Sequence, residues 1–297
     1  MKQLMMKSET AVSVIAVLLA MLSITAGASL AKSLFAEAAP VGVTSMRLMF
    51  SAVILIIGLK TWQVRLNRSN VEAVILYGFT IAGMNLFLYM AIERIPVGVA
   101  IAIELMGPLL VSILFSENRS DYLWAGLAAL GILFLLPITS GAPELDPLGL
   151  MYAGFAAIFW GFYVVVGKRA GQQHGRQAPS LGIFIASLLV LPVGFESLTQ
   201  INFGGELVIL LLCVALLSSA IPMMLEMKAL IHLPTKTYGV LTSGEPVVGA
   251  IVSFVILGEE LTTFQSLGIA TIVMASIGAV LSPGKSVLRN IKISSQG

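Results

Sequence analysis

Two glutamates stand near the middle of long apolar stretches, where an ionisable side chain is costly. Glu104 is the eighth residue of a stretch over 97–115, and Glu245 is the ninth residue of a stretch over 237–257. A charge at the centre of a hydrocarbon layer costs about 2.5–3.5 kcal/mol on insertion scales, and such residues commonly mark a path for ions or substrates. We expect the two carboxylates to bind an ammonium group or to exchange a proton.

Each of these glutamates has a proline close behind it. Pro108 comes four residues after Glu104, and Pro246 directly follows Glu245. A proline inside a helix removes one backbone hydrogen bond, and the carbonyl four residues earlier loses its donor. The freed carbonyls are those of Glu104 and Thr242. We therefore predict a helix break at each site, with a polar notch of carboxylate and carbonyl oxygens.

Two basic residues also fall inside apolar stretches, Lys32 within 11–34 and Arg47 within 41–59. Arg47 carries a permanent charge that suits the carboxylate of a substrate. The alternative for Arg47 is a structural ion pair with Glu104 or Glu245. Lys32 lies near the end of its stretch, and its alternative is to extend the ammonium group to the outer membrane interface.

Uncharged polar side chains near these charges are candidates for lining the same cavity. In each case the alternative is a polar group satisfied by the neighbouring helix. Glu226 is a weaker candidate, because it lies close to Lys228 and to the edge of its apolar stretch. The uncharged candidates are Asn85, Tyr89, Tyr238 and Ser243, with Thr237 and Thr242 beside them.

The elements that must position these residues are ten apolar stretches of membrane-spanning length. A span needs about 20 mostly apolar residues. Of the 297 residues 58% are hydrophobic and only 11% are charged, which leaves no room for a sizeable soluble domain. The class predicted is an all-α membrane protein with ten transmembrane helices. The stretches are 11–34, 41–59, 71–92, 97–115, 122–138, 148–166, 179–195, 207–227, 237–257 and 264–281.

The sequence offers little for enzymatic, metal or cofactor chemistry. Cys213 is the one cysteine and lies inside an apolar stretch, and the two histidines, His174 and His232, fall in connecting segments. The segment Ala279–Ser286 resembles the tail of a phosphate-binding loop but lacks its first glycine and the preceding strand. We expect no metal, no cofactor, no nucleic-acid partner and no enzyme activity.

The distribution of Lys and Arg predicts how the stretches are threaded. With ten alternating crossings, 14 of the 17 Lys and Arg fall on one face, Arg94 falls on the other, and Lys32 and Arg47 stay inside. Basic residues gather on the cytoplasmic side, so both termini are predicted to be cytoplasmic. An alternative, a cleaved signal peptide over the first stretch, leaves nine spans. The fourteen are Lys2, Lys7, Lys60, Arg65, Arg68, Arg119, Lys168, Arg169, Arg176, Lys228, Lys236, Lys285, Arg289 and Lys292.

The stretches form two similar halves, over 1–140 and 141–297. Ala91–Pro96 before the fourth stretch matches Ala229–Pro234 before the ninth, and each is followed twelve residues later by another proline. Five spans per half is an odd number, so the two halves must have opposite orientations. Inverted five-helix repeats are typical of secondary transporters with alternating access. The alternative is a duplicated membrane scaffold that transports nothing.

Motifs spread over nearly the whole chain resemble the drug/metabolite transporter superfamily, EamA type. The surroundings of Lys32, Glu104 and Glu226 are most similar to those of its bacterial inner-membrane exporters of threonine and homoserine. The resemblance implies ten spans and proton-driven export of small neutral amino acids, but it does not itself assign the binding residues. The motifs are Gly27–Phe35, Met46–Leu48, Gly83–Asn85, Pro96–Glu104, Gly107–Pro108, Arg169–Gly171, His174–Gly175, Leu225–Met227, Leu233–Thr237, Glu245–Pro246 and Leu257–Glu259.

The predicted function is therefore proton antiport that exports a small neutral amino acid from the cytoplasm across a bacterial inner membrane. An amino acid is a zwitterion, so a midplane glutamate and a nearby Arg or Lys match its two ends. The partners expected are the amino acid, protons and membrane lipid, and the sequence leaves the oligomeric state open. Alternatives are another substrate such as a nucleoside, a purine base or a cationic drug, a channel, and a non-transporting scaffold.

Overall fold

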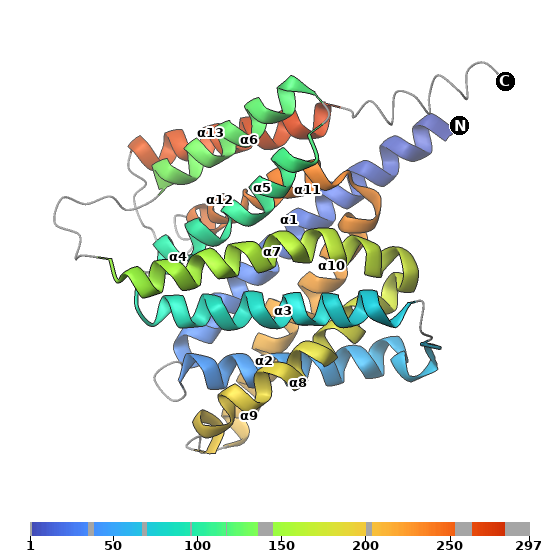
Figure 1. Ribbon diagram of the computed structural model, residues 1–297, viewed down its shortest axis with the longest axis vertical. Helices are drawn as coiled ribbons and strands as arrows, with labels where there is room; N and C mark the ends of the chain where they lie inside the picture. The colour runs from blue at the N-terminus through green and yellow to red at the C-terminus, as the bar shows by residue number, and fades with distance from the viewer. Residues whose placement is uncertain are drawn as a thin grey trace.

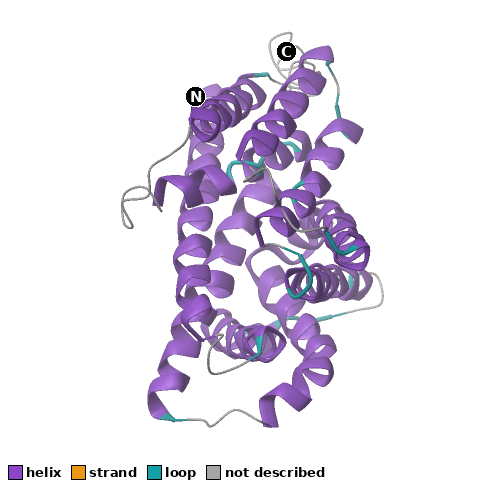
Figure 2. Cartoon of the chain, turned by 90° about the vertical axis from the view of Figure 1, so that its left-hand side faces the viewer, coloured by secondary structure: helices purple, strands orange, loops and turns teal. Residues whose placement is uncertain are grey.

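The computed structural model describes residues 2–34, 39–66, 70–95, 97–116, 118–135, 145–199, 204–252 and 263–282. Every regular element within these ranges is a helix (Figures 1 and 2), so the all-α class is confirmed for this part of the chain. The helices are α1 (Lys2–Leu34), α2 (Pro40–Leu59), η1 (Thr61–Gln63), α3 (Val71–Ile92), α4 (Val97–Glu104), α5 (Met106–Leu114), α6 (Arg119–Leu135), α7 (Pro147–His174), η2 (Gly175–Gln177), α8 (Ala178–Thr199), α9 (Gly205–Ala215), the π-helical turn η3 (Leu216–Ala220), α10 (Ile221–His232), α11 (Thr235–Thr242), α12 (Glu245–Val252) and α13 (Thr263–Leu281).

The helices coincide with the apolar stretches of the sequence. Within the described ranges, five helical segments are long and apolar enough to cross a membrane by length and composition. One of them, Pro147–Thr199, contains both α7 and α8. The chain turns between these two helices at Gly175, whose positive φ of 54° suits a glycine. The other four are Glu9–Ala28, Pro40–Leu59, Val71–Ile92 and Gly205–His232, and Val99–Leu114 and Ser266–Leu281 are shorter apolar helices.

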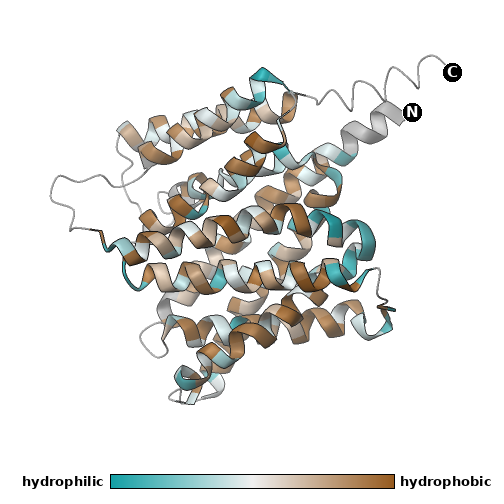
Figure 3. Ribbon diagram, viewed as in Figure 1, coloured by the Kyte–Doolittle hydropathy of each residue, from teal (hydrophilic) through white to brown (hydrophobic). Residues whose placement is uncertain are grey.

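The outer surface of the described helices is strongly apolar. Leu114 is 79% exposed, Phe264 67% and Phe195 63%. Apolar colour runs along the middle of the helices, and polar colour gathers towards their ends (Figure 3). An aqueous surface rarely carries so much contiguous apolar area, whereas lipid-facing helices require it. The chain is therefore a multi-pass membrane protein.

Helices from distant parts of the sequence pack in pairs. In the first pairs, α3 lies along α7, α2 along α8 and α1 along α10. In the remaining pairs, α6 lies beside α13 at one edge of the bundle and α5 packs against α11 (Figure 1). Most of the buried apolar side chains form one cluster that joins helices of both sequence halves. The two halves therefore share one interior.

Polar contacts hold one end of this bundle together. The Thr61 and Ser180 hydroxyl oxygens lie 2.7 Å apart, which joins the end of α2 to the start of α8. His174 Nε2 lies 3.0 Å from the Asn70 carbonyl oxygen, which joins the end of α7 to the start of α3. The segments that meet here are those that the charge distribution assigned to a common face.

Candidate functional site

The two glutamates stand at interruptions of their helices. α4 ends at Glu104 and α5 begins at Met106, while α11 ends at Thr242 and α12 begins at Glu245. The prolines explain both interruptions, because Pro108 and Pro246 lie in the first turn of the second helix, where a missing N–H is tolerated. Each carboxylate is therefore next to backbone that has left the regular helix.

Close backbone approach brings the two interruptions together. A Cβ on Gly239 of α11 would collide with the Pro108 carbonyl of α5, and a Cβ on Gly107 of α5 would collide with the Ala157 carbonyl of α7. Only glycine permits helices to approach so closely at these positions. α11, α5 and α7 are thus packed backbone against backbone beside the glutamates.

The two carboxylates lie within electrostatic range of each other. Glu104 is 5% exposed and Glu245 is half-buried. The carboxylate of Glu104 interacts electrostatically with that of Glu245 and with the guanidinium of Arg47. Among the described residues, no nitrogen of Lys, Arg or His lies within 4.0 Å of either carboxylate. Among the described residues, neither carboxylate has a close ion-pair partner in this conformation, so both can take up a cationic ligand or a proton.

Arg47 of α2 is held by two residues of α3 that the sequence placed in the same cavity. One of its guanidinium nitrogens donates a hydrogen bond to Asn85 Oδ1, and its Cζ lies 5.9 Å from the ring centroid of Tyr89. Asn85 is itself oriented by donating Nδ2 to the Ile81 carbonyl at 2.8 Å. The Nε of Arg47 is buried and has no hydrogen-bond partner among the described residues. A charge fixed from one side and unsatisfied at Nε is suited to an anionic ligand.

The remaining candidates are satisfied locally, are buried near the glutamates, or have side chains outside the described part of the chain. Ser243 is fully buried and donates to the Val240 carbonyl at 2.5 Å, so its hydroxyl caps its own helix. Tyr238 is fully buried on α11. Lys32 belongs to α1, but its side chain lies outside the described part of the chain. Ser243 is therefore less suited to a ligand than Asn85 or Tyr89.

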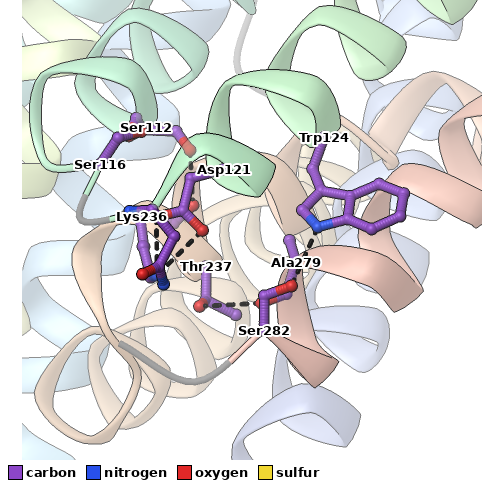
Figure 4. Close-up of polar contacts among 9 residues, drawn as sticks. Ser112, Ser116, Asp121, Trp124, Lys236, Thr237, Ala279 and Ser282 are labelled. Atoms are coloured by element: carbon purple, nitrogen blue, oxygen red, sulfur yellow. Dashed lines mark hydrogen bonds and ion pairs between the residues drawn. The ribbon is translucent and has the colours of Figure 1, made fainter. Parts of the chain in front are cut away.

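A buried ion pair was missed by the sequence reasoning. Lys236 Nζ lies 3.0 Å from Asp121 Oδ1 and 2.9 Å from Oδ2, joining α11 to α6, and Ser112 of α5 donates to the Lys236 carbonyl at 2.8 Å (Figure 4). The two charged side chains are 6% and 4% exposed. Lys236 stands where an apolar stretch begins, and the sequence assigns it to the basic face without indicating that it is buried or paired with Asp121.

Glu226 also has a defined partner that the sequence did not reveal. The Tyr163 hydroxyl of α7 donates to Glu226 Oε2 of α10 at 2.7 Å. The nearby Lys228 is exposed. Residues two apart on a helix do not face each other. Glu226 is therefore bound by Tyr163 and not by its neighbour in the sequence, Lys228.

These features define the class: an integral membrane transporter whose interrupted helices carry buried carboxylates. The model of the EamA-like transporter family matches residues 147–281. The chain is 39% identical over 272 residues to the threonine/homoserine exporter RhtA of Escherichia coli K12, covering 92% of each protein, and 39% identical over 269 residues to RhtA of Salmonella typhimurium SL1344, covering 91% of each. The chain belongs to the EamA-like transporter family and is a transporter, not an enzyme.

A solved structure shares the fold. Its TM-score with this chain is 0.78 at 17% sequence identity, and the match covers 93% of this chain and 97% of the other. The arrangement of helices is therefore one that an experimentally determined protein adopts along almost its full length.

Proposed function

We propose that this protein is a secondary active transporter that exports small neutral amino acids of the threonine and homoserine type in exchange for protons. We further propose that it resides in the cytoplasmic membrane of a bacterium. Support for the substrate class comes from the RhtA exporters, which match this chain over nine-tenths of its length. The observation that carries the mechanism is the pair of glutamates, Glu104 and Glu245, at neighbouring helix interruptions.

Alternating access would come from two inverted halves, 1–140 and 141–297, of five spans each. If the spans correspond in order, α1 matches α7, α2 matches α8, α3 matches α9 with α10, and α6 matches α13. A pseudo-twofold axis then relates α1 beside α10 to α7 beside α3. The same axis maps the pairs α2–α8 and α6–α13 onto themselves. All of these pairs pack together in the described structure. The packing supports the inverted repeat, in which each half can open towards one side.

The central charges match the two ends of a zwitterion. The carboxylates of Glu104 and Glu245 provide a site for the substrate ammonium group, beside carbonyls that the prolines leave without a helical donor. Arg47, oriented by Asn85 and Tyr89, provides a bidentate partner for the substrate carboxylate. The substrate's small polar side chain needs little further recognition.

Exchange follows because the ammonium group and a proton compete for the same carboxylates. Towards the outside, a proton binds the glutamate oxygen and neutralises it, so the ammonium group leaves. Towards the cytoplasm, the proton is released to water and the carboxylate is again free to bind an ammonium group. One site that holds either ligand couples the two fluxes, since the carrier returns only when one of them is bound.

The experiment is threonine and homoserine uptake into proteoliposomes whose lumen is more acidic than the bath. We expect accumulation above equilibrium in the wild type. Glu104→Gln should lose at least ten-fold of this accumulation, because an amide cannot exchange a proton for a cation. Correct folding of the variant is checked by its elution as a single peak in size-exclusion chromatography, and its insertion by the amount recovered in the vesicle fraction after flotation.

The alternatives are separated by the substrate panel. Uptake of a nucleoside, a purine base or a cationic drug but of no amino acid would contradict the substrate class. Equal accumulation in Glu104→Gln would contradict the role of this carboxylate. No uptake of any compound on the panel would favour the scaffold.

A further inference from the structure

Glu226 is a third carboxylate within the helical bundle, and it has no place in the central site. It lies on α10, six residues before the helix ends at His232, or about 9 Å along the axis at 1.5 Å per residue. That end belongs to the face with most of the basic residues. The side chain is half-buried, so one part of it contacts the protein interior while another remains accessible.

No basic side chain neutralises Glu226 within the described part of the chain. Lys228 is exposed on another face of α10, Lys168 donates to the Leu233 carbonyl at 2.7 Å, and Lys236 is bound to Asp121. Within the described part of the chain, the carboxylate therefore has no ion-pair partner. Other described ionisable side chains on elements packed against α10 are Glu9 on α1, Tyr152, Arg169 and His174 on α7, Arg176 on η2, Glu196 on α8 and Tyr238 on α11.

Three tyrosines surround this carboxylate instead. Tyr77, Tyr163 and Tyr238 are fully buried, and the rings of Tyr77 and Tyr163 stack with centroids 5.3 Å apart. Tyr163 donates to Glu226, and the hydroxyls of Tyr77 and Tyr238 interact with Glu226 electrostatically. The hydroxyls of Tyr77 and Tyr238 also interact with the Tyr163 side chain, so the three tyrosines and Glu226 form one connected polar group.

The Tyr77 ring packs into a narrow slot between a glycine of α7 and a glycine of α8. A Cβ on Gly167 of α7 would lie 2.8 Å from Tyr77 Cε2, and a Cβ on Gly182 of α8 would also collide with the ring. Both α7 and α8 therefore have a glycine where they contact the Tyr77 ring. Such a slot fixes the hydroxyl in one place, which suits a hydrogen-bonded path better than a loosely packed core.

Electrostatic contact links Glu226 to the central site. Glu226 interacts with Glu245, and Glu245 interacts with Glu104. The order Glu104, Glu245, Glu226 leads from the helix interruptions towards the end of α10. A charge that appears on one of these carboxylates therefore disfavours charge on the next.

Building on the proposed function, we propose that Glu226 and Tyr163 form a second proton-binding site, through which protons pass between the central carboxylates and the cytoplasm. As the central pair releases a proton, an O–H bond forms at Glu226. That bond breaks when the proton moves on to water at the cytoplasmic end. Tyr163 donates to the ionised carboxylate and accepts from the protonated one. Each step is a proton transfer between oxygen atoms and requires no further reactant.

The test separates substrate binding from proton coupling in one set of vesicles. Counterflow, the exchange of labelled for unlabelled threonine without a pH gradient, requires the substrate site but no net proton movement. Accumulation driven by an acidic lumen requires both. We expect Glu226→Gln to keep counterflow within about two-fold of the wild type and to lose at least ten-fold of the accumulation. Glu226→Asp should restore part of it, and Tyr163→Phe should change the pH profile of accumulation with counterflow retained.

The matched control is Glu206→Gln, the same substitution at an exposed glutamate in the first turn of α9, which should leave both measurements unchanged. Accumulation retained by Glu226→Gln would overturn the second proton site alone. Loss of counterflow together with accumulation would also overturn it, because Glu226 would then act on the substrate or the fold. A wild type that shows counterflow but no response to pH would overturn the proposed proton antiport, and the second site with it.

Discussion

The buried ion pair between Asp121 and Lys236 allows a quantitative prediction about stability. Asp121→Asn keeps the shape of the side chain and an oxygen that can accept from the Asn118 N–H, now 2.9 Å from Asp121 Oδ2. It removes the negative charge and leaves the Lys236 ammonium group buried at 6% exposure. Removing one partner of a buried pair costs about 3–5 kcal/mol. This corresponds to a fall of roughly 150-fold to 4,500-fold in the folded-to-unfolded ratio.

The double variant Asp121→Asn with Lys236→Met should recover most of this loss. Methionine at position 236 keeps the apolar part of the lysine side chain and removes the uncompensated charge. Apolar replacement of a buried ion pair is often neutral for stability. A second control is Arg94→Gln, which breaks an ion pair whose side chains are 44% and 35% exposed. Exposed pairs contribute little because solvent screens them, so this change should be small.

The assay is unfolding of the purified protein in mixed micelles by increasing fractions of sodium dodecyl sulfate, followed by tryptophan fluorescence. Trp124 reports locally, since its Nε1 donates to the Ser282 hydroxyl at 3.0 Å beside the pair. If Asp121→Asn unfolds at the same detergent fraction as the wild type, the buried pair does not stabilise the fold. If the double variant is as unstable as the single one, shape rather than charge accounts for the loss.

Three further predictions concern close packing, the substrate carboxylate and acid stability. Gly239→Ala should lower the unfolding midpoint measurably, because its Cβ would meet the Pro108 backbone, whereas Gly154→Ala, with nothing within 4 Å, should not. Arg47→Lys should raise the KM for threonine counterflow several-fold, because an ammonium group cannot replace the planar guanidinium between Asn85 and Tyr89. An unchanged KM would show that Arg47 does not bind the substrate. The pKa of Asp146 is lowered by a hydrogen bond from Arg94 and, to a smaller extent, by one from the Leu148 N–H. The ionised carboxylate therefore stabilises the fold above the unfolded pKa of roughly 3.9, and this stabilisation is lost as pH falls through the lower folded pKa. Asp146→Asn should weaken the fall of the thermal midpoint between pH 4 and pH 2, and an identical fall in both proteins would contradict this assignment.

The features that could be predicted from the sequence are those set by short-range chemistry. Proline removes a backbone donor wherever it stands, so interruptions near Glu104 and Glu245 follow from Pro108 and Pro246 without knowledge of the packing. The helical class follows from apolar length. Neither inference requires knowing which helices become neighbours.

The features that could not be predicted depend on which helices meet. Lys236 stands where an apolar stretch begins, which is also where exposed charges are common, and only the packing of α11 against α6 shows that it is buried with Asp121. Glu226 stands two residues from Lys228 in the sequence, which suggests an ion pair, but helical geometry directs the two side chains to different faces. The spacing of the aromatic residues gave no sign that Tyr77, Tyr163 and Tyr238 come together from three helices.

The central claim is that one site exchanges an amino acid for a proton, and the most direct measurement records both in the same vesicles. Proteoliposomes loaded with threonine and a pH-sensitive dye are diluted into threonine-free buffer of equal pH. We predict that the lumen acidifies as threonine leaves, and that the acidification disappears in Glu104→Gln. Threonine efflux from the wild type with no change in lumenal pH would contradict proton antiport.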